Sequence, residues 1–173
     1  MIDNKFIIQW KHIEATTFMY GTTLSFDDNK VKFKNELMPA GTVIHSWMMT
    51  SAYFRERHIP SLPILKRNKA YHIKFNIEET PANSVYFKLS MYRRNKSLIE
   101  AIIFNEKEGT FTYSEEAYYY EIEMLSASVK SFEFESITIE AISNIHQLNC
   151  DEQSFNYNNA NVLKQLKRDD IKR

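Results

Sequence analysis

The chain has 173 residues, with 22 basic and 22 acidic side chains and therefore no formal net charge. Hydrophobic residues make up 43% of the sequence and aromatic residues 14%, which predicts one packed domain and excludes global disorder. A general nucleic-acid-binding protein needs an excess of lysine and arginine to neutralise phosphates, so the balanced charge argues against that class.

Alternation of apolar and polar residues predicts a series of short β-strands. In chain order, the predicted strands cover residues 24–26, 31–33, 71–78, 85–92, 97–104, 110–113, 118–124 and 132–139. A single hairpin is not stable alone in water, so we expect two facing antiparallel sheets. The predicted fold is an all-β, jelly-roll-like sandwich in a single domain over residues 1–146.

The two clearest strands, 71–78 and 85–92, are separated by turn-forming residues at 79–84, which predicts an antiparallel hairpin. In the second strand the odd-numbered residues are apolar and face inward, so Tyr86 and Tyr92 point outward.

The strand at 118–124 has its inward row on the even-numbered residues, Tyr118 included, which leaves Tyr119 outside. In the last strand the apolar phase changes after Phe134. This change predicts a β-bulge at Glu135 or Ser136.

Two regions lack this alternation. Residues 35–66 contain three prolines, and we interpret them as a long connecting segment that is functional or contains a further strand. Residues 147–173 are predicted to be a polar C-terminal tail with a weak helical spacing, either mobile or helical only on contact with a partner.

No apolar run approaches the roughly 20 residues that a membrane-spanning helix needs, and the N-terminus lacks the apolar segment of a signal peptide. Cys150 is the only cysteine, so no intrachain disulfide can form, which fits a reducing compartment. We therefore expect a cytoplasmic protein without direct membrane insertion.

Candidate catalytic chemistry is sparse. The five histidines have no metal-ligand spacing, and no phosphate-binding or nucleophile motif is present, so we expect no catalytic, cofactor or metal site. Glu121 and Glu123 are the kind of paired carboxylates that glycoside hydrolysis uses, which keeps a small hydrolase as a rival hypothesis. Because they alternate with apolar residues, a solvated outer face explains them better.

Outward aromatic residues are more informative. Tyr86, Tyr92 and Tyr119 could anchor a protein interface, be covered by the chain's own 35–66 segment or tail, or stack on sugars. Because tryptophan and arginine are enriched at binding hot spots, Trp47, Arg55 and Arg57 are further candidate partner contacts. A buried Trp47 that holds its own loop is the alternative.

Short blocks of sequence resemble a known family in the same order along residues 20–140. The blocks are Tyr20-Gly21-Thr22, residues 35–47 (NELMPAGTVIHSW), 60–66 (PSLPILK), 84–88 (SVYFK) and 118–124 (YYYEIEM). They are similar to the third subunit of the accessory secretory (Asp) proteins of the accessory Sec system.

The resemblance implies a small, non-enzymatic cytosolic subunit that assembles with two larger Asp partners. It implies delivery of serine-rich repeat glycoprotein adhesins to an accessory SecA-type motor and SecY-type channel, with recruitment to the inner face of the membrane. It also implies a sandwich similar to carbohydrate-binding modules, with the sugar-modifying chemistry on a partner. The alternative function is a lectin-like module that binds the sugars of the exported glycoprotein directly.

Overall fold

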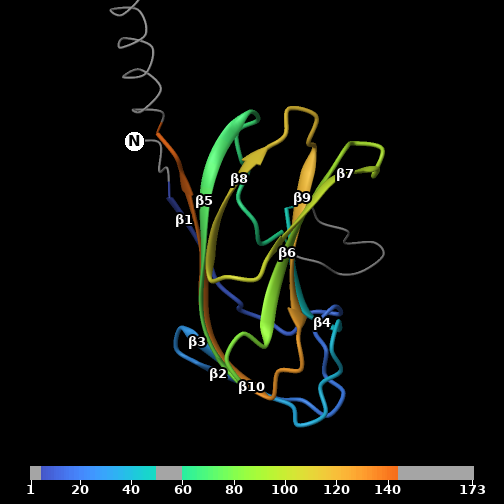
Figure 1. The fold of residues 1–173 in the computed structure, drawn as a ribbon, viewed down its shortest axis with the longest axis vertical. Coiled ribbons are helices and arrows are strands. Elements are labelled where there is room, and N and C mark those ends of the chain that lie inside the picture. Colours follow the sequence, from blue (N-terminus) through green and yellow to red (C-terminus); the bar gives the residue numbers. More distant parts are fainter. Residues whose placement is uncertain (1–4, 50–59, 144–173) are drawn as a thin grey trace, which may run out of the picture. The chain divides into compact units, whose positions relative to one another are not determined.

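The computed structural model describes residues 5–49 and 60–143, which contain ten β-strands (Figure 1). The strands are β1 (Lys5–Ile8), β2 (Thr23–Asp27), β3 (Lys30–Lys34), β4 (Val43–Met48), β5 (Lys69–Thr80), β6 (Val85–Tyr92), β7 (Leu98–Phe104), β8 (Glu108–Tyr113), β9 (Tyr119–Ser126) and β10 (Ser131–Ala141). No helix in these described ranges is long and apolar enough to cross a membrane.

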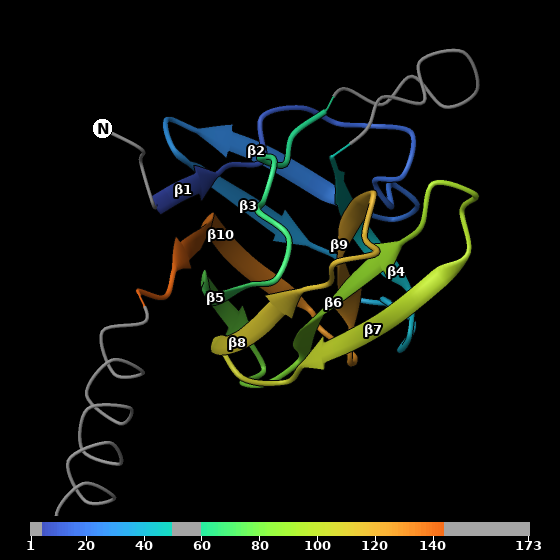
Figure 2. The ribbon, with the colours of Figure 1, turned by 90° about the horizontal axis from the view of Figure 1, so that it is seen from above.

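The strands form two antiparallel sheets that face each other (Figure 2). The first sheet has the order β2-β3-β10-β5-β8, with β1 also paired to β10, and the second has the order β4-β9-β6-β7. From β3 onward the chain crosses between the sheets at every connection except β6–β7. This connectivity confirms the predicted jelly-roll-like sandwich.

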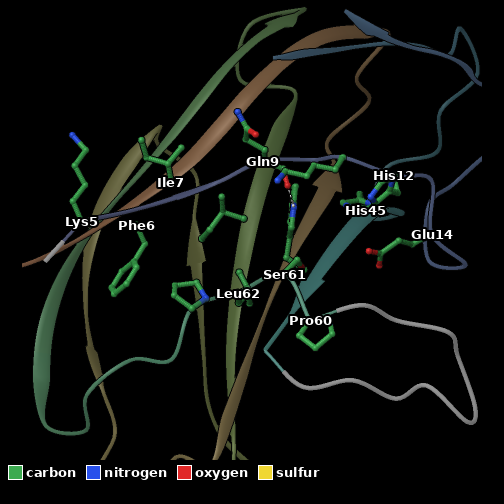
Figure 3. A pocket seen from close by; sticks show the side chains of 14 residues that line it. Lys5, Phe6, Ile7, Gln9, His12, Glu14, His45, Pro60, Ser61 and Leu62 are labelled. Carbon is green, nitrogen blue, oxygen red and sulfur yellow. Dashed lines mark hydrogen bonds between the residues drawn. The ribbon is translucent and has the colours of Figure 1, made fainter. Parts of the chain in front are cut away.

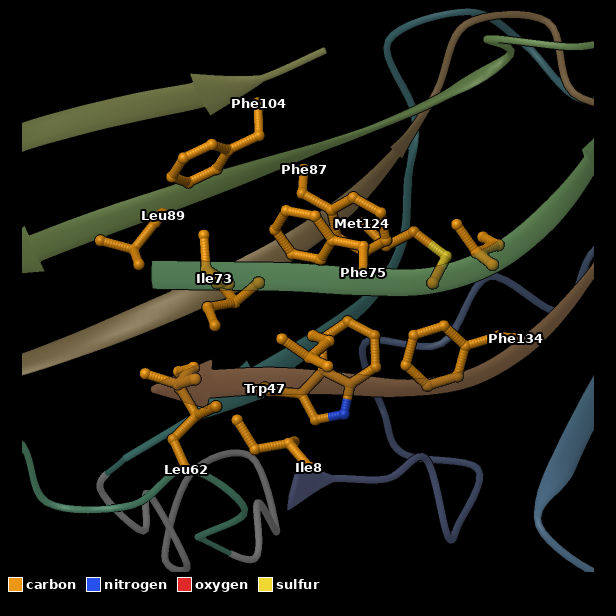
Figure 4. Packing of buried hydrophobic residues seen from close by; sticks show 14 of the residues in the cluster. Ile8, Trp47, Leu62, Ile73, Phe75, Phe87, Leu89, Phe104, Met124 and Phe134 are labelled. Atoms are coloured by element: carbon orange, nitrogen blue, oxygen red, sulfur yellow. The ribbon is translucent and has the colours of Figure 1, made fainter. Parts of the chain in front are cut away.

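Apolar side chains from both sheets fill the space between them (Figure 4). The largest fully buried ones are Phe33, Ile44, Trp47, Ile73, Phe75, Leu89, Met91, Tyr120, Ile122, Met124, Phe134 and Ile137. Each contributes roughly 1.5–3 kcal/mol of hydrophobic stabilisation before the entropy of ordering is subtracted. They come from both sheets, so neither sheet is stable without the other.

The predicted hairpin of 71–78 with 85–92 is wrong. In the structure β5 pairs with β10 and β8 of the first sheet, whereas β6 pairs with β7 and β9 of the second. The turn-forming residues after β5 carry the chain across the core to the facing sheet. A hairpin within one sheet and a crossing between two sheets have the same turn residues and the same alternation, because each strand buries one face in both arrangements.

The predicted β-bulge is confirmed. The register of β10 on β5 shifts between Phe134 and Ser136, so the inward row changes from Phe134 to Ile137, and both of these side chains are completely buried. The extra residue lets one strand keep its apolar side chains in the core on both sides of the shift.

Residues 35–66 do contain a further strand, β4. Its four central residues, Ile44 to Trp47, are all buried, so both faces of this strand are covered. Such a strand shows no polar alternation in sequence, which is why the pattern did not reveal it. The polar tail predicted over 147–173 lies outside the described residues.

Candidate partner interface

The outer face of the second sheet carries the predicted outward tyrosines. β6 and β9 are antiparallel neighbours, and their register places Tyr92 directly opposite Tyr119 and Lys88 opposite Glu123. Alternate side chains of β6 point away from the core, so Tyr86, Lys88 and Tyr92 share this face.

Tyr92 and Tyr119 form a stacked pair on this face. Their ring centroids lie 4.9 Å apart and the ring planes differ by 13°. Partial burial is the main cause that raises the pKa of the Tyr119 hydroxyl, so this phenol is neutral at physiological pH. The pair therefore presents a half-buried aromatic surface.

Residues from adjoining segments enlarge this surface. The Tyr118 backbone N–H donates a hydrogen bond to the Tyr92 carbonyl oxygen (2.8 Å), and the guanidinium carbon of Arg94 lies 5.9 Å from the centre of the Tyr118 ring. Leu98 of β7, opposite Tyr92 in the register, is about half exposed. We call Tyr92, Tyr118, Tyr119 and Leu98 the tyrosine cluster.

Tyr118 was expected in the inward row, and this expectation is wrong. β9 begins at Tyr119, so Tyr118 precedes the strand and its side chain is exposed. Alternation along the sequence therefore did not reveal Tyr118 and Leu98 as members of the surface. Their proximity depends on which strands are neighbours, which alternation along one strand does not reveal.

The middle of the face is charged. Lys88 and Glu123 form an ion pair with 2.5 Å between Nζ and Oε2, and the hydrogen bond to Glu123 is the main cause that raises the pKa of Lys88. Tyr86 lies beyond Lys88, opposite Leu125. Six residues of a strand span roughly 20 Å, so Tyr86 is separate from the tyrosine cluster.

Trp47 is not on this surface. It belongs to β4, is only 1% exposed, and its indole N–H donates a hydrogen bond to the Gln9 carbonyl oxygen (3.3 Å). A side chain so buried cannot contact a partner without rearrangement, so the structure corrects its assignment as a partner contact. The alternative hypothesis, in which Trp47 is buried, agrees better with the structure. Arg55 and Arg57 lie outside the described residues.

A cleft of about 670 Å³ opens beside β1 and the segment that follows it (Figure 3). Its lining residues are Lys5, Phe6, Ile7, Ile8, Gln9, Lys11, His12, Glu14, His45, Trp47 and Pro60–Pro63. In the described part of the chain, no group of three histidine, cysteine or acidic side chains is placed to hold a metal ion.

The fold and the surface together define an antiparallel β-sandwich whose candidate site is a patch of aromatic side chains on one sheet. The family model described as "Accessory Sec secretory system ASP3" matches residues 17–141. This chain belongs to that family, as the sequence blocks indicated.

Two individual relatives support the same family assignment. The chain is 39% identical over 156 residues to "Accessory Sec system protein Asp3" of Staphylococcus aureus, covering 90% of this chain and 48% of the relative. It is also 39% identical over 127 residues to the protein of the same name from Streptococcus gordonii, covering 73% of this chain and 80% of the relative. The chain thus spans about half the length of the first relative.

A solved structure is similar as well. One chain in a crystal structure of accessory secretory proteins 1, 2 and 3 of Streptococcus pneumoniae superposes with a TM-score of 0.74 at 33% identity. The match covers 79% of this chain and 95% of the other.

Proposed function

We propose that this chain is a non-enzymatic subunit that assembles with the two larger Asp proteins of an accessory Sec system. The observation that carries the proposal is the similarity to a chain solved together with accessory secretory proteins. The shared fold and the 33% identity support an equivalent place in an equivalent assembly.

The tyrosine cluster is the surface that we assign to a partner. Tyrosine is enriched at binding hot spots because it offers a large, rigid contact area together with a hydroxyl group. The stacking of Tyr92 on Tyr119 fixes both rings before binding, so little side-chain entropy is lost when a partner covers them. Arg94 beside Tyr118 adds a cation to the rim of this surface.

In this proposal the assembled subunit works in the cytoplasm, recruited to the inner face of the membrane. There it helps to deliver serine-rich repeat glycoprotein adhesins to the accessory SecA-type motor and channel. The family match and the tyrosine cluster support a role through contacts, and the Glu123 carboxylate is engaged by Lys88 in an ion pair.

Co-purification tests the assembly. The tagged full chain is expressed with the two larger subunits, and their recovery is compared for the wild type and the variant Tyr92→Ser/Tyr119→Ser. We expect the wild type to retain both subunits and the variant to lose most of at least one. Ile7→Ser replaces an exposed apolar residue on the first sheet and serves as the control. A wild-type chain that stays alone in the presence of both subunits would contradict the proposal.

The lectin-like alternative predicts a different result. If this surface stacks on sugars, the isolated chain should bind a peptide that carries N-acetylglucosamine, and Tyr92→Ser should abolish that binding. We expect no saturable binding by the isolated chain in a calorimetric titration. Saturable, Tyr92-dependent binding would favour the lectin-like function instead.

A further inference from the structure

Two neighbouring loops carry the most exposed large apolar side chains in the described part of the chain. Tyr20, in the loop before β2, is 88% exposed, and Leu37, in the loop between β3 and β4, is 90% exposed. The second loop lies at the end of the sandwich where β9 finishes, because Gly41 N–H donates a hydrogen bond to the Ser126 carbonyl oxygen (2.7 Å) (Figure 1). The first loop is joined to it through the side chain of Asn35. We call Tyr20 and Leu37 the loop-tip pair.

One buried amide holds the two loops together. The side-chain nitrogen of Asn35 donates hydrogen bonds to the Tyr20 carbonyl oxygen (2.9 Å) and to Thr22 Oγ1 (3.1 Å). Its side-chain oxygen accepts a hydrogen bond from the Leu37 backbone N–H (3.0 Å). Asn35 itself is only 4% exposed. The backbones of both tip residues are therefore fixed to the same side chain.

Side chains that pack on the core anchor each loop as well. Phe18 packs on the core, and its backbone N–H donates a hydrogen bond to the Ile44 carbonyl oxygen (2.8 Å). The Thr22 hydroxyl donates to the Phe18 carbonyl oxygen (3.0 Å) and closes the first loop. Met38 is buried directly after Leu37. The loop tips thus project from a backbone that is held on both sides.

The buried Asn35 amide stabilises the two loops, but the backbones that it fixes hold two apolar side chains in water. Two large apolar side chains remain in water, although a polar side chain is buried to hold their backbones in place. A prearranged apolar projection binds well because its ordering entropy is already lost before association. Its complement is a concave apolar pocket that takes one aromatic and one aliphatic side chain.

We infer that the loop-tip pair inserts into an apolar pocket on one of the two larger Asp subunits. This inference rests on the proposed function and names a second contact surface for it. The tyrosine cluster lies at the start of β9 and the loop-tip pair near its end, roughly 20 Å away along the strand. A chain with contact surfaces at both ends of one sheet is suited to join two partners.

The two clefts beside β1 and over β3 and β10 would be poor hosts for the pair in a second copy of this chain. The cleft beside β1 is lined by Lys5, Lys11 and Glu14 among others. A second cleft, over β3 and β10, is lined by Lys32, Lys34, Glu78, Glu79 and Glu133 together with several uncharged residues. Insertion of a leucine into either would desolvate charged groups without pairing them. Neither of these two clefts is therefore a suitable host for the pair.

The test measures binding of the full chain to the purified pair of larger subunits by biolayer interferometry. Tyr20→Ser/Leu37→Ser removes the loop-tip pair, and Ile64→Ser is the matched control because Ile64 is 81% exposed and belongs to neither loop. Thermal unfolding of each variant checks that the fold is retained, which we expect because these side chains bury little surface.

We expect the loop-tip variant to raise the Kd by about 30-fold or more, as loss of a binding hot spot does, and the control to leave it unchanged. Equal binding by the wild type and the loop-tip variant would overturn this inference and leave the proposed function standing. No binding by the wild type would overturn the proposed function and, with it, this inference.

Discussion

Phe75 of β5 and Phe87 of β6 stack across the core, with their ring centroids 3.9 Å apart and their planes within 7° of each other. The two strands are consecutive in the chain but belong to opposite sheets, so this contact joins the two layers of the sandwich. In a hairpin the same two side chains would lie side by side on one face. The stack is therefore direct evidence that the chain crosses from one sheet to the other between β5 and β6, which the sequence pattern did not reveal.

Loss of this stack should weaken the whole fold. Phe87→Ala leaves a cavity between the sheets, and we expect the free energy of unfolding to fall by about 3–5 kcal/mol. Tyr86→Ala, on the outer face of the same strand, is the control and should cost about 1 kcal/mol or less. Urea denaturation followed by fluorescence measures both. Equal losses for the two variants would mean that the core does not lie where β6 places it.

Much of the sandwich was predictable because most of the long strands bury only one face. The alternation in β5, β6, β9 and β10 indicated strands and inward rows, and the phase change near Ser136 indicated the bulge. β4 was not predictable from alternation because both of its faces are covered. Pairing was not predictable either, since alternation says which side chains point inward but not which sheet they belong to.

The candidate site was predictable only in part. The outward direction of Tyr92 and Tyr119 follows from alternation, whereas their stacking requires the register of β6 on β9. Trp47 has a residue type that is common at interfaces, but in this chain it fills the core. The loop-tip pair has no periodic signal, because it depends on hydrogen bonds from Asn35 to a loop 15 residues earlier.

Tyr120 should make the fold sensitive to alkaline pH. Its buried hydroxyl donates a hydrogen bond to the Pro63 carbonyl oxygen (2.8 Å), and burial raises its pKa well above the ordinary value of 10.0. Below pH 10 the phenol is neutral in both states and adds no pH dependence. Above pH 10 the unfolded chain loses this proton while the folded chain keeps it, so stability falls as the pH rises.

The variant Tyr120→Phe separates the contribution of the hydrogen bond to Pro63 from the effect of the phenol's titration. At pH 8 we expect it to be less stable than the wild type by about 1 kcal/mol, because the bond to Pro63 is lost. At pH 11 the difference in free energy of unfolding should be smaller, because only the wild type is destabilised by ionisation of this phenol in its unfolded state. Urea denaturation at both pH values measures the difference. An unchanged difference would show that Tyr120 titrates normally in the folded protein.

Asn35 should control the order of the two loops. Asn35→Ala removes three hydrogen bonds, and we expect a loss of about 1–3 kcal/mol in stability together with faster cleavage of the loops by proteases. Asn35→Asp keeps an acceptor for the Leu37 N–H but buries a carboxylate whose other oxygen faces the Tyr20 carbonyl oxygen, so its loss should be at least as large. Cleavage of both variants at the wild-type rate would contradict the role of this amide.

Gly109 should be required for space beside Phe104. A Cβ at this position would lie 2.6 Å from two carbons of the Phe104 ring, so Gly109→Ala should cost about 1–3 kcal/mol. Phe104→Leu makes room, so the double variant should lose less than the sum of the two single losses. Gly41→Ala is the contrast: its Cβ would meet nothing within 4 Å, but its φ of +78° is unfavourable for alanine. Phe104→Leu should leave the loss at Gly41 unchanged.

Hydrogen exchange of the full chain with and without the two larger subunits tests the central claim most directly. The account predicts slower amide exchange in the complex at residues 18–22 and 35–38 and around the tyrosine cluster, with the outer face of the first sheet unchanged. Exchange that is the same with and without the subunits throughout residues 5–49 and 60–143 would contradict it.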